Sequence, residues 1–554
     1  METQVFKYAS FRLTLYFLLL QLIAITGGAQ IVPTVHDSID LNDVNALMYS
    51  DGLGFWNQIT NITHYRIPKQ DSSTGTIFAS GLWIAGIDAG GKLHIAASTY
   101  KQNGTDYWPG PMMDSVDYSA HQDSVWNKIW KINKSTIDSF RLHKFIGVPA
   151  SIANWPGNGN ISMGEMPQLA PYVDSCHCGW YNPSAGDYPL IRGDQVLYFI
   201  FNDDRGSSHG ETKGKKLGIE VHLMVYQFKT LNDTAVNQTT FLHYDIYNRS
   251  KNTYDSTYLG YYCDMDIGNG ALNFIGCDSA DNYWYSYNAD SINFNGSGNF
   301  GGEIGYGGPV PPPPAEGVVY LCDTISHFIY YFNNFNMQGN PRSDTDYFLY
   351  LQSYWIDRSH MTYGGTGFHS GPNNANFMFN GDPASKTGWY EGADTNNKPN
   401  DVRGLSSKGP CVFAPGAALT ADLALVFSRS DTGNQNTSVT TLGTAIADVK
   451  NFYSAQNYGC FKTLLSMNNI NPANTIKAML YPNPMHNAAI LSVNTILDNA
   501  VLKLYDLTGR NVGIVQYIHT QYFVINRNGL ANGMYFYVLF NQGEVITSGK
   551  VVIQ

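Results

Sequence analysis

One short segment of the chain concentrates the residue types that bind hard metal ions. The segment "CDMDIGNGALNFIGCDSADN" carries four aspartates, Asp264, Asp266, Asp278 and Asp281, and the glycines Gly268 and Gly270 follow the first two. Calcium takes six to eight oxygen ligands and tolerates irregular cages, and the glycines permit the tight backbone that such a cage needs. The glutamate that ends an EF-hand loop is absent. The segment predicts a structural Ca²⁺ site, and the alternative is a solvated turn in which the aspartates accept hydrogen bonds from backbone amides.

The seven cysteines are too few for a disulfide scaffold, and their odd number leaves at least one unpaired within the chain. Cys263 and Cys277 bracket the aspartate-rich loop, and we predict that a disulfide between them closes it. Cys176 and Cys178 are too close for easy mutual bonding, so each is predicted to bridge elsewhere or to stay reduced. A zinc site built on them and His177 lacks a second ligand pair at zinc spacing.

No motif for nucleophilic catalysis is present, because the chain has neither a G-x-S-x-G elbow nor an H-E-x-x-H helix. The segment "FNDDRGSSHGE" places an aspartate, a serine and a histidine almost side by side, whereas catalytic triads are assembled from distant segments. We interpret it as a polar loop. A glycosidase needs two carboxylates at the right separation, and Glu220, Asp245 and Glu303 are equal candidates. The sequence therefore assigns no catalytic residue.

Two tryptophan-containing loops suit sugar binding by composition. Trp108 in "DYWPGP" and Trp155 in "NWPGNG" stand beside polar residues, and a flat aromatic face can stack on a sugar ring. The more frequent role of such residues is to lock a loop onto its own sheet. We predict the second role for both.

The first thirty residues have the order of a secretory signal peptide. Lys7 and Arg12 precede an apolar run, and small residues follow it, so cleavage is expected between Ala29 and Gln30. The run is short for a membrane span, and no later segment is apolar enough to cross a bilayer. We expect residues 1–29 to be removed and the mature protein to lack a transmembrane segment.

The composition favours sheets over helices. Only 14% of the residues are charged, while tyrosine (38) and glycine (54) are abundant, and the net charge of −11 argues against a nucleic-acid partner. Short alternating runs predict an all-β body of one or two sandwich domains, with a β-rich region at 30–262 and a second at 263–467 that ends in a helix near 438–458. The predicted strands include a hairpin at 77–100 and runs at 194–201, 217–231, 239–248, 345–355 and 421–427.

A stiff joint separates this body from the tail. Residues 468–477 are polar and aperiodic, which predicts a linker, and the following "YPNP" sequence restricts the backbone to extended conformations. Seven short apolar runs then fit into residues 478–554, separated by turn residues such as "LTGR" and "GLANG". This pattern predicts a small independent β-sandwich.

The tail carries a set of separated motif residues, namely Tyr481, Pro482, Asn483, Pro484, Asp506, Gly509, Arg510, Gly533, Tyr535 and Lys550. In this order at the end of the chain they resemble the type A C-terminal sorting domain of the type IX secretion system of Bacteroidetes. The resemblance implies an Ig-like seven-stranded sandwich that an outer-membrane translocon recognises after Sec export. It also implies a sortase-like peptidase that removes the domain, and a cargo that is released or fixed to surface lipopolysaccharide.

Several body segments, such as "FNGDPASKTGWYEG" and "LSSKGPCVFAPG", resemble parts of large secreted Bacteroidetes proteins whose biochemical role is unknown. The resemblance gives a setting without a chemistry. We therefore expect a secreted or cell-surface protein with a non-catalytic adhesion, matrix or glycan-contacting role. The alternatives are a secreted hydrolase of polysaccharides or peptides, and a purely structural subunit.

Overall fold

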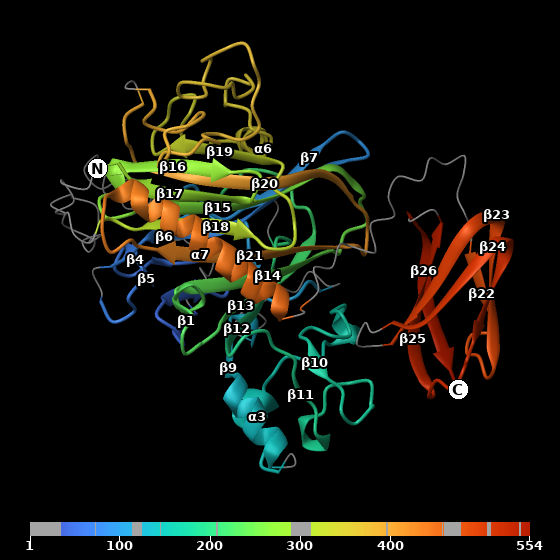
Figure 1. Cartoon of the computed structure of the whole chain (residues 1–554). Coiled ribbons are helices and arrows are strands. Elements are labelled where there is room, and N and C mark those ends of the chain that lie inside the picture. The colour runs from blue at the N-terminus through green and yellow to red at the C-terminus, as the bar shows by residue number, and fades with distance from the viewer. Residues whose placement is uncertain are drawn as a thin grey trace, which may run out of the picture. The chain divides into compact units, whose positions relative to one another are not determined.

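The computed structural model describes residues 35–71, 74–113, 125–143, 146–205, 209–289, 312–394, 397–456, 458, 478–506, 511–541 and 544–554. The predicted signal peptide with its Ala29–Gln30 cleavage site and the predicted linker at 468–477 lie outside these residues. The chain divides into two compact units, Met1–Leu465 and Ser466–Gln554 (Figure 1). Among the residues just given, no helix is both long and apolar enough to cross a membrane.

The body is built on a nine-stranded antiparallel sheet with the order β16-β17-β18-β21-β14-β13-β12-β8, in which β9 also pairs with β12. Its strands are β8 (Trp108–Pro109), β9 (Trp130–Asn133), β12 (Gln195–Asn202), β13 (Ile219–Gln227), β14 (Thr239–Asn248), β16 (Asn273–Asp278), β17 (Tyr283–Asn288), β18 (Ala315–Tyr320) and β21 (Ala418–Ser428).

A second sheet of five strands has the order β19-β20-β15-β6-β7. Its strands are β6 (Ile77–Asp88), β7 (Leu93–Ala97), β15 (Tyr254–Met265), β19 (His327–Phe332) and β20 (Val402–Phe413). The predicted hairpin at 77–100 is confirmed as β6 and β7. Asp88 shapes its turn, because the Asp88 carboxylate accepts hydrogen bonds from the Gly90 and Lys92 amides at 2.8 and 2.9 Å.

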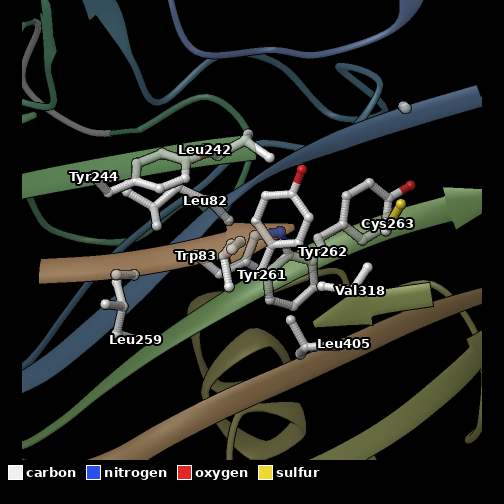
Figure 2. Packing of buried hydrophobic residues seen from close by; sticks show 14 of the residues in the cluster. Leu82, Trp83, Leu242, Tyr244, Leu259, Tyr261, Tyr262, Cys263, Val318 and Leu405 are labelled. Carbon is white, nitrogen blue, oxygen red and sulfur yellow. The ribbon is translucent and has the colours of Figure 1, made fainter. Parts of the chain in front are cut away.

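The two sheets pack face to face around one large apolar core, so the all-β sandwich prediction is confirmed. Figure 2 shows aromatic and aliphatic side chains from both sheets meeting there. Trp83 of β6 stacks on Tyr262 of β15 with ring centroids 5.7 Å apart. The boundary predicted between residues 262 and 263 falls inside β15, which pairs with both β6 and β20. No division of the body into two compact units is found there.

The alternation along β13 explains why the nine-stranded sheet has two different faces. Leu217, Ile219, Val221, Leu223 and Val225 face the inter-sheet core, as their spacing predicts. The intervening residues point to the outer face. Helix α7 (Gln435–Ala455) crosses this outer face against β17, β18 and β21, and it matches the predicted helix with a start three residues earlier (Figure 1).

One predicted strand is wrong, because residues 345–355 contain helix α6 (Asp344–Tyr350) instead. The Ser343 hydroxyl accepts a hydrogen bond from the Asp346 amide, which caps the helix, and aspartates in its first turn suit the helix dipole. Tyr347 and Tyr350, one turn apart, are buried together against the core. An aromatic run with this spacing is compatible with both the helical and the strand period. The N-terminal cap at Ser343 favours the helix.

The remaining described elements are short. One three-stranded sheet and two strand pairs precede or flank the main sheets and comprise β1 (His36–Ile39), β2 (Asn45–Tyr49), β3 (Trp56–Asn57), β4 (Ile62–Thr63), β5 (Tyr65–Arg66), β10 (Tyr172–Val173) and β11 (Tyr188–Pro189). The short helices are α3 (Lys134–Leu142), α4 (Ala150–Ala153), α5 (Thr234–Asn237), η1 (Ile161–Met163), η2 (Pro183–Ala185) and η3 (Gly270–Leu272).

The C-terminal unit is an antiparallel β-domain with its own apolar core. Seven strands were predicted, and the described residues form five, because β23 and β24 each join two of the predicted runs into one continuous strand. The five strands are β22 (Ala478–Tyr481), β23 (Ala488–Tyr505), β24 (Asn511–Asn526), β25 (Gly533–Asn541) and β26 (Glu544–Ile553). The first half of β23 pairs with β22 and its second half with β25, while β24 pairs with both halves.

Candidate functional site

The first and last motifs of the tail meet in the structure. The Asn483 side chain donates a hydrogen bond to the Lys550 carbonyl at 2.9 Å and accepts one from the Val552 amide at 2.8 Å. The Met485 amide donates to the Val552 carbonyl at 2.7 Å. The "YPNP" segment is therefore fastened to the final strand of the same domain.

The "GLANG" turn of the tail is organised by a residue that the motif analysis did not single out. Arg527 donates hydrogen bonds to the Leu530 carbonyl at 3.0 Å and to the Asn532 side chain at 2.7 Å. Tyr535 closes the same turn by donating its hydroxyl to the Ala531 carbonyl at 3.0 Å. Gly533 has a φ of +157°, which a side chain would strain.

The other predicted motif residues of the tail are only partly described. Asp506 is half-buried at the end of β23, and the Lys550 side chain is exposed on β26. Gly509 and Arg510 lie outside the described residues.

A row of ionisable side chains crosses the outer face of the nine-stranded sheet, and we call it the polar row. It comes from alternate positions of three adjacent strands and comprises Glu220, His222, His243, Asp245 and Asp422. The side chains of Glu220 and His222 contact at 2.7 Å, and His222 stands directly opposite Asp245 in the ladder. The sequence named Glu220 and Asp245 as candidate carboxylates, and the structure brings both into this row. Glu303 lies outside the described residues.

Each carboxylate of the polar row faces a basic group. Arg249 contacts Glu220 at 2.6 Å, and Arg192 contacts Asp422 at 2.8 Å. His243 lies between the last two carboxylates, with Nδ1 2.9 Å from Asp422 and Nε2 3.3 Å from Asp245. Sequence analysis did not identify these basic partners, because Arg192 and Arg249 lie far along the chain from their carboxylates and His243 reaches Asp422 only through the pairing of β14 with β21.

The charges of the polar row follow from these contacts. Burial opposes the charged form of His243, but its hydrogen bonds to Asp245 and Asp422 outweigh burial and raise its pKa to about 9. Burial likewise opposes ionisation of Asp245 and Asp422, yet the contact with His243 holds the pKa of both carboxyls below its usual value. At neutral pH both carboxylates are ionised and His243 carries a proton. Asp245 keeps about a third of its side chain exposed (33%), whereas Glu220 is fully buried.

The loop that the sequence predicted to be polar contains a second network, which is wholly buried. His209 donates from Nδ1 to the Ile95 carbonyl at 2.6 Å and from Nε2 to the Asp203 carbonyl at 2.9 Å. Two acceptors require protons on both ring nitrogens, so His209 is an imidazolium. Burial opposes this charge, but Asp106 and Asp203 outweigh it and raise the pKa of His209. Asp204 is half-buried next to this network, and Ser208 lies outside the described residues.

The aspartates of the predicted calcium site separate into two groups. Asp264 and Asp266 lie together with Asp401, each offering one carboxylate oxygen within 4.8 Å of the others. Asp278 and Asp281 belong instead to the turn between β16 and β17, where the Asp278 carboxylate accepts hydrogen bonds from two backbone amides at 3.1 Å. The sequence could not identify Asp401, because it precedes β20 and comes near Asp264 only through the β15–β20 pairing.

The two predictions about cysteines are wrong. Cys263 on β15 and Cys277 on β16 are both free and buried, and each thiol packs into the apolar core. Burial raises the pKa of both thiols well above the usual range. Cys176 and Cys178 are bonded to each other, in a tight loop where Asp174 accepts hydrogen bonds from the Cys178 and Gly179 amides.

The two tryptophans considered for sugar stacking are buried. Trp108 is 2% exposed and Trp155 is 3% exposed. The Trp155 indole donates a hydrogen bond to the Pro171 carbonyl at 2.9 Å, which holds its loop against the sheet. Both side chains are buried in the body, so neither ring face is free to stack on a sugar.

The tail defines the protein as an exported one. Residues 479–554 match the family described as secretion system C-terminal sorting domain. The chain is therefore a type IX secretion cargo of the kind found in Bacteroidetes, and it is exported to the cell surface or the extracellular space. Its tail interacts with the secretion machinery. The match confirms the resemblance drawn from the tail motifs.

Comparisons of the whole chain give only distant likenesses. None of the curated proteins matches it in sequence. A polysaccharide lyase structure is similar over 69% of this chain and 38% of that chain, with 8% identity and a TM-score of 0.17. The dimeric latent PorU from Porphyromonas gingivalis is similar over 65% of this chain and 31% of that one, with 12% identity and a TM-score of 0.13. The chain spans less than two fifths of either structure, and neither likeness assigns a function to it.

Proposed function

We propose that the exported body is a non-catalytic adhesion or matrix protein that contacts glycans through the open end of the polar row. Asp245 and Tyr247 of β14 reach the surface there, and Arg249 borders them. Surface glycans are the partners that suit an exported protein with this face.

The proposal rests on the pairing of carboxylates with basic groups in the polar row. Three carboxylates face three basic groups at 2.6, 2.8 and 3.3 Å, so the row is close to neutral as a whole. A general acid must hold a proton near the working pH. The low pKa of Asp245 and Asp422 makes both unsuitable as general acids, whereas ionised carboxylates are good acceptors for sugar hydroxyls.

The near-neutral balance also indicates the class of ligand. A row without excess charge gains little from an acidic or a cationic polymer, since long-range attraction depends on net charge. We therefore expect neutral glycans to bind, with an affinity that changes little with salt concentration.

The hydrolase alternative has one supporting observation. Glu165 lies at the edge of the polar row, where it is 7% exposed, and burial raises the pKa of its carboxyl. A carboxyl with a raised pKa near an ionised carboxylate is the arrangement that glycoside hydrolysis uses. The Glu165 carboxylate also accepts a hydrogen bond from the Asn160 amide at 2.6 Å, which explains its position without catalysis.

The purified full-length chain should be tested on a glycan array and against a panel of polysaccharides and peptides. We expect retention of neutral glycans without product, at least tenfold weaker binding for Asp245→Asn, and unchanged binding for Asp255→Asn, which alters an exposed aspartate on β15. Release of product that is lost in Glu165→Gln would replace this proposal with the hydrolase. Binding that Asp245→Asn leaves unchanged would contradict the assignment to the polar row.

A further inference from the structure

Three carboxylates converge where β15 ends and β20 begins. Asp264 stands at the end of β15, Asp266 follows it by two residues, and Asp401 comes directly before β20. One oxygen from each lies within 4.8 Å of the other two. Calcium binds oxygen at about 2.3–2.6 Å, so a single ion can contact groups separated by up to about 5 Å.

The burial of Asp264 points to a ligand beyond the cluster itself. Its side chain is 1% exposed, and neither of its carboxylate oxygens accepts a hydrogen bond. Buried carboxylate oxygens normally have partners, because leaving them without one costs free energy. The contact that Asp264 does make is an ion pair with Arg403, whose Nε lies 3.2 Å from one oxygen.

Arg403 cannot neutralise the cluster alone. Its guanidinium also contacts Asp401 at 2.8 Å, and the side chain is itself buried above the ring of Tyr100. The one guanidinium is therefore shared between Asp264 and Asp401. Like charges at this separation disfavour one another, and a second cation would relieve them.

We propose that Asp264, Asp266 and Asp401 bind a calcium ion that ties the end of β15 to the start of β20. The three protein ligands are oxygens only, which suits a hard cation, and carbonyl oxygens and water would complete an irregular shell. The ion joins two strands that are neighbours in the five-stranded sheet but lie far apart in the sequence. Its role is structural. This set replaces the Asp278 and Asp281 ligands that the sequence suggested.

The purified full-length chain, stripped with chelator and dialysed, provides the test. Terbium is a luminescent substitute for calcium, and Tyr100, whose ring lies 5.6 Å from the Arg403 Cζ atom, is close enough to the cluster to sensitise it. We expect saturable terbium luminescence that calcium displaces, and a melting temperature that rises with calcium. Asp401→Asn should weaken calcium binding at least tenfold, while the matched Asp278→Asn variant should bind like the wild type.

Circular dichroism in chelator shows whether Asp401→Asn still folds, and Asp266→Asn serves as a second variant if it does not. A wild-type chain without a calcium-dependent shift or terbium signal overturns the proposal. Equal binding by Asp401→Asn and the wild type, or loss of binding in Asp278→Asn alone, overturns the ligand assignment.

Discussion

The body holds two histidine-centred networks that differ in how their charges are fixed. His209 lies wholly buried, and backbone carbonyls accept hydrogen bonds from both of its ring N–H groups. His243 lies on the outer face, and carboxylate side chains contact both of its nitrogens. Backbone groups cannot move without disturbing the fold, whereas side chains that partly reach solvent, as Asp245 does, can change partners. The comparison assigns the buried network to stability and leaves the outer row available for a ligand.

The largest effect is expected from breaking the buried network. His209→Gln removes the cation between Asp106 and Asp203 and leaves both carboxylates buried without it. We expect a loss of roughly 3–5 kcal/mol in the free energy of unfolding, measured by chemical denaturation. His143→Gln, on an exposed helix end, is the matched control and should change stability by less than about 0.5 kcal/mol. Similar values for the two variants would contradict the structural role of His209.

Buried acid groups of the body should make its stability depend on pH. Glu316 of β18 is fully buried, and burial raises its pKa to about 8 from 4.5. The folded state therefore keeps a proton that the unfolded state loses above pH 4.5, and stability falls as pH rises from about 4.5 to 8. The shift corresponds to roughly 3–5 kcal/mol over that range. Unfolding measured across pH should show this decline in the wild type and a flatter profile in Glu316→Gln.

The raised pKa of His209 adds to the same trend. The contribution of His209 to stability is complete below its pKa in the unfolded chain, 6.5, and is lost as pH rises through its pKa in the folded state. The pH profiles of the His209→Gln and Glu316→Gln single variants, compared with that of the double variant, separate the two contributions to stability, because the pH windows of the two groups begin at different values. A body whose stability rises between pH 5 and 8 would contradict both assignments.

Sequence patterns predicted the apolar framework better than the polar contacts. The alternation along β13 and the amphipathic spacing of α7 determine which face is buried, and both appear as predicted. Local rules failed where a cap overrode periodicity, as at Ser343, and where an interaction depended on strand pairing. Asp401 joins Asp264 through the register of β15 with β20, and that register is not encoded in the spacing of either segment.

Breaking the outer network should cost less than breaking the buried one. His243→Gln removes a charge that two carboxylates share, but 14% of its side chain is exposed, so water can partly replace it. We expect a loss of about 1–3 kcal/mol in unfolding free energy. The difference from the wild type should shrink as pH rises through about 9, where His243 of the folded wild type loses its proton. A loss as large as that of His209→Gln would remove the distinction between the two networks.

The smallest effect on stability is expected at Asp245, where the outer row meets solvent. Asp245→Asn keeps the size of the side chain and a hydrogen-bond acceptor, so we expect a change below about 1 kcal/mol. Glycan binding should fall at the same time, because an amide oxygen is a weaker acceptor for sugar hydroxyls than an ionised carboxylate. Measuring unfolding and glycan affinity on the same preparation tests both. If stability and affinity fell together by large amounts, Asp245 would belong with the structural groups, and the outer row would no longer differ in kind from the buried network.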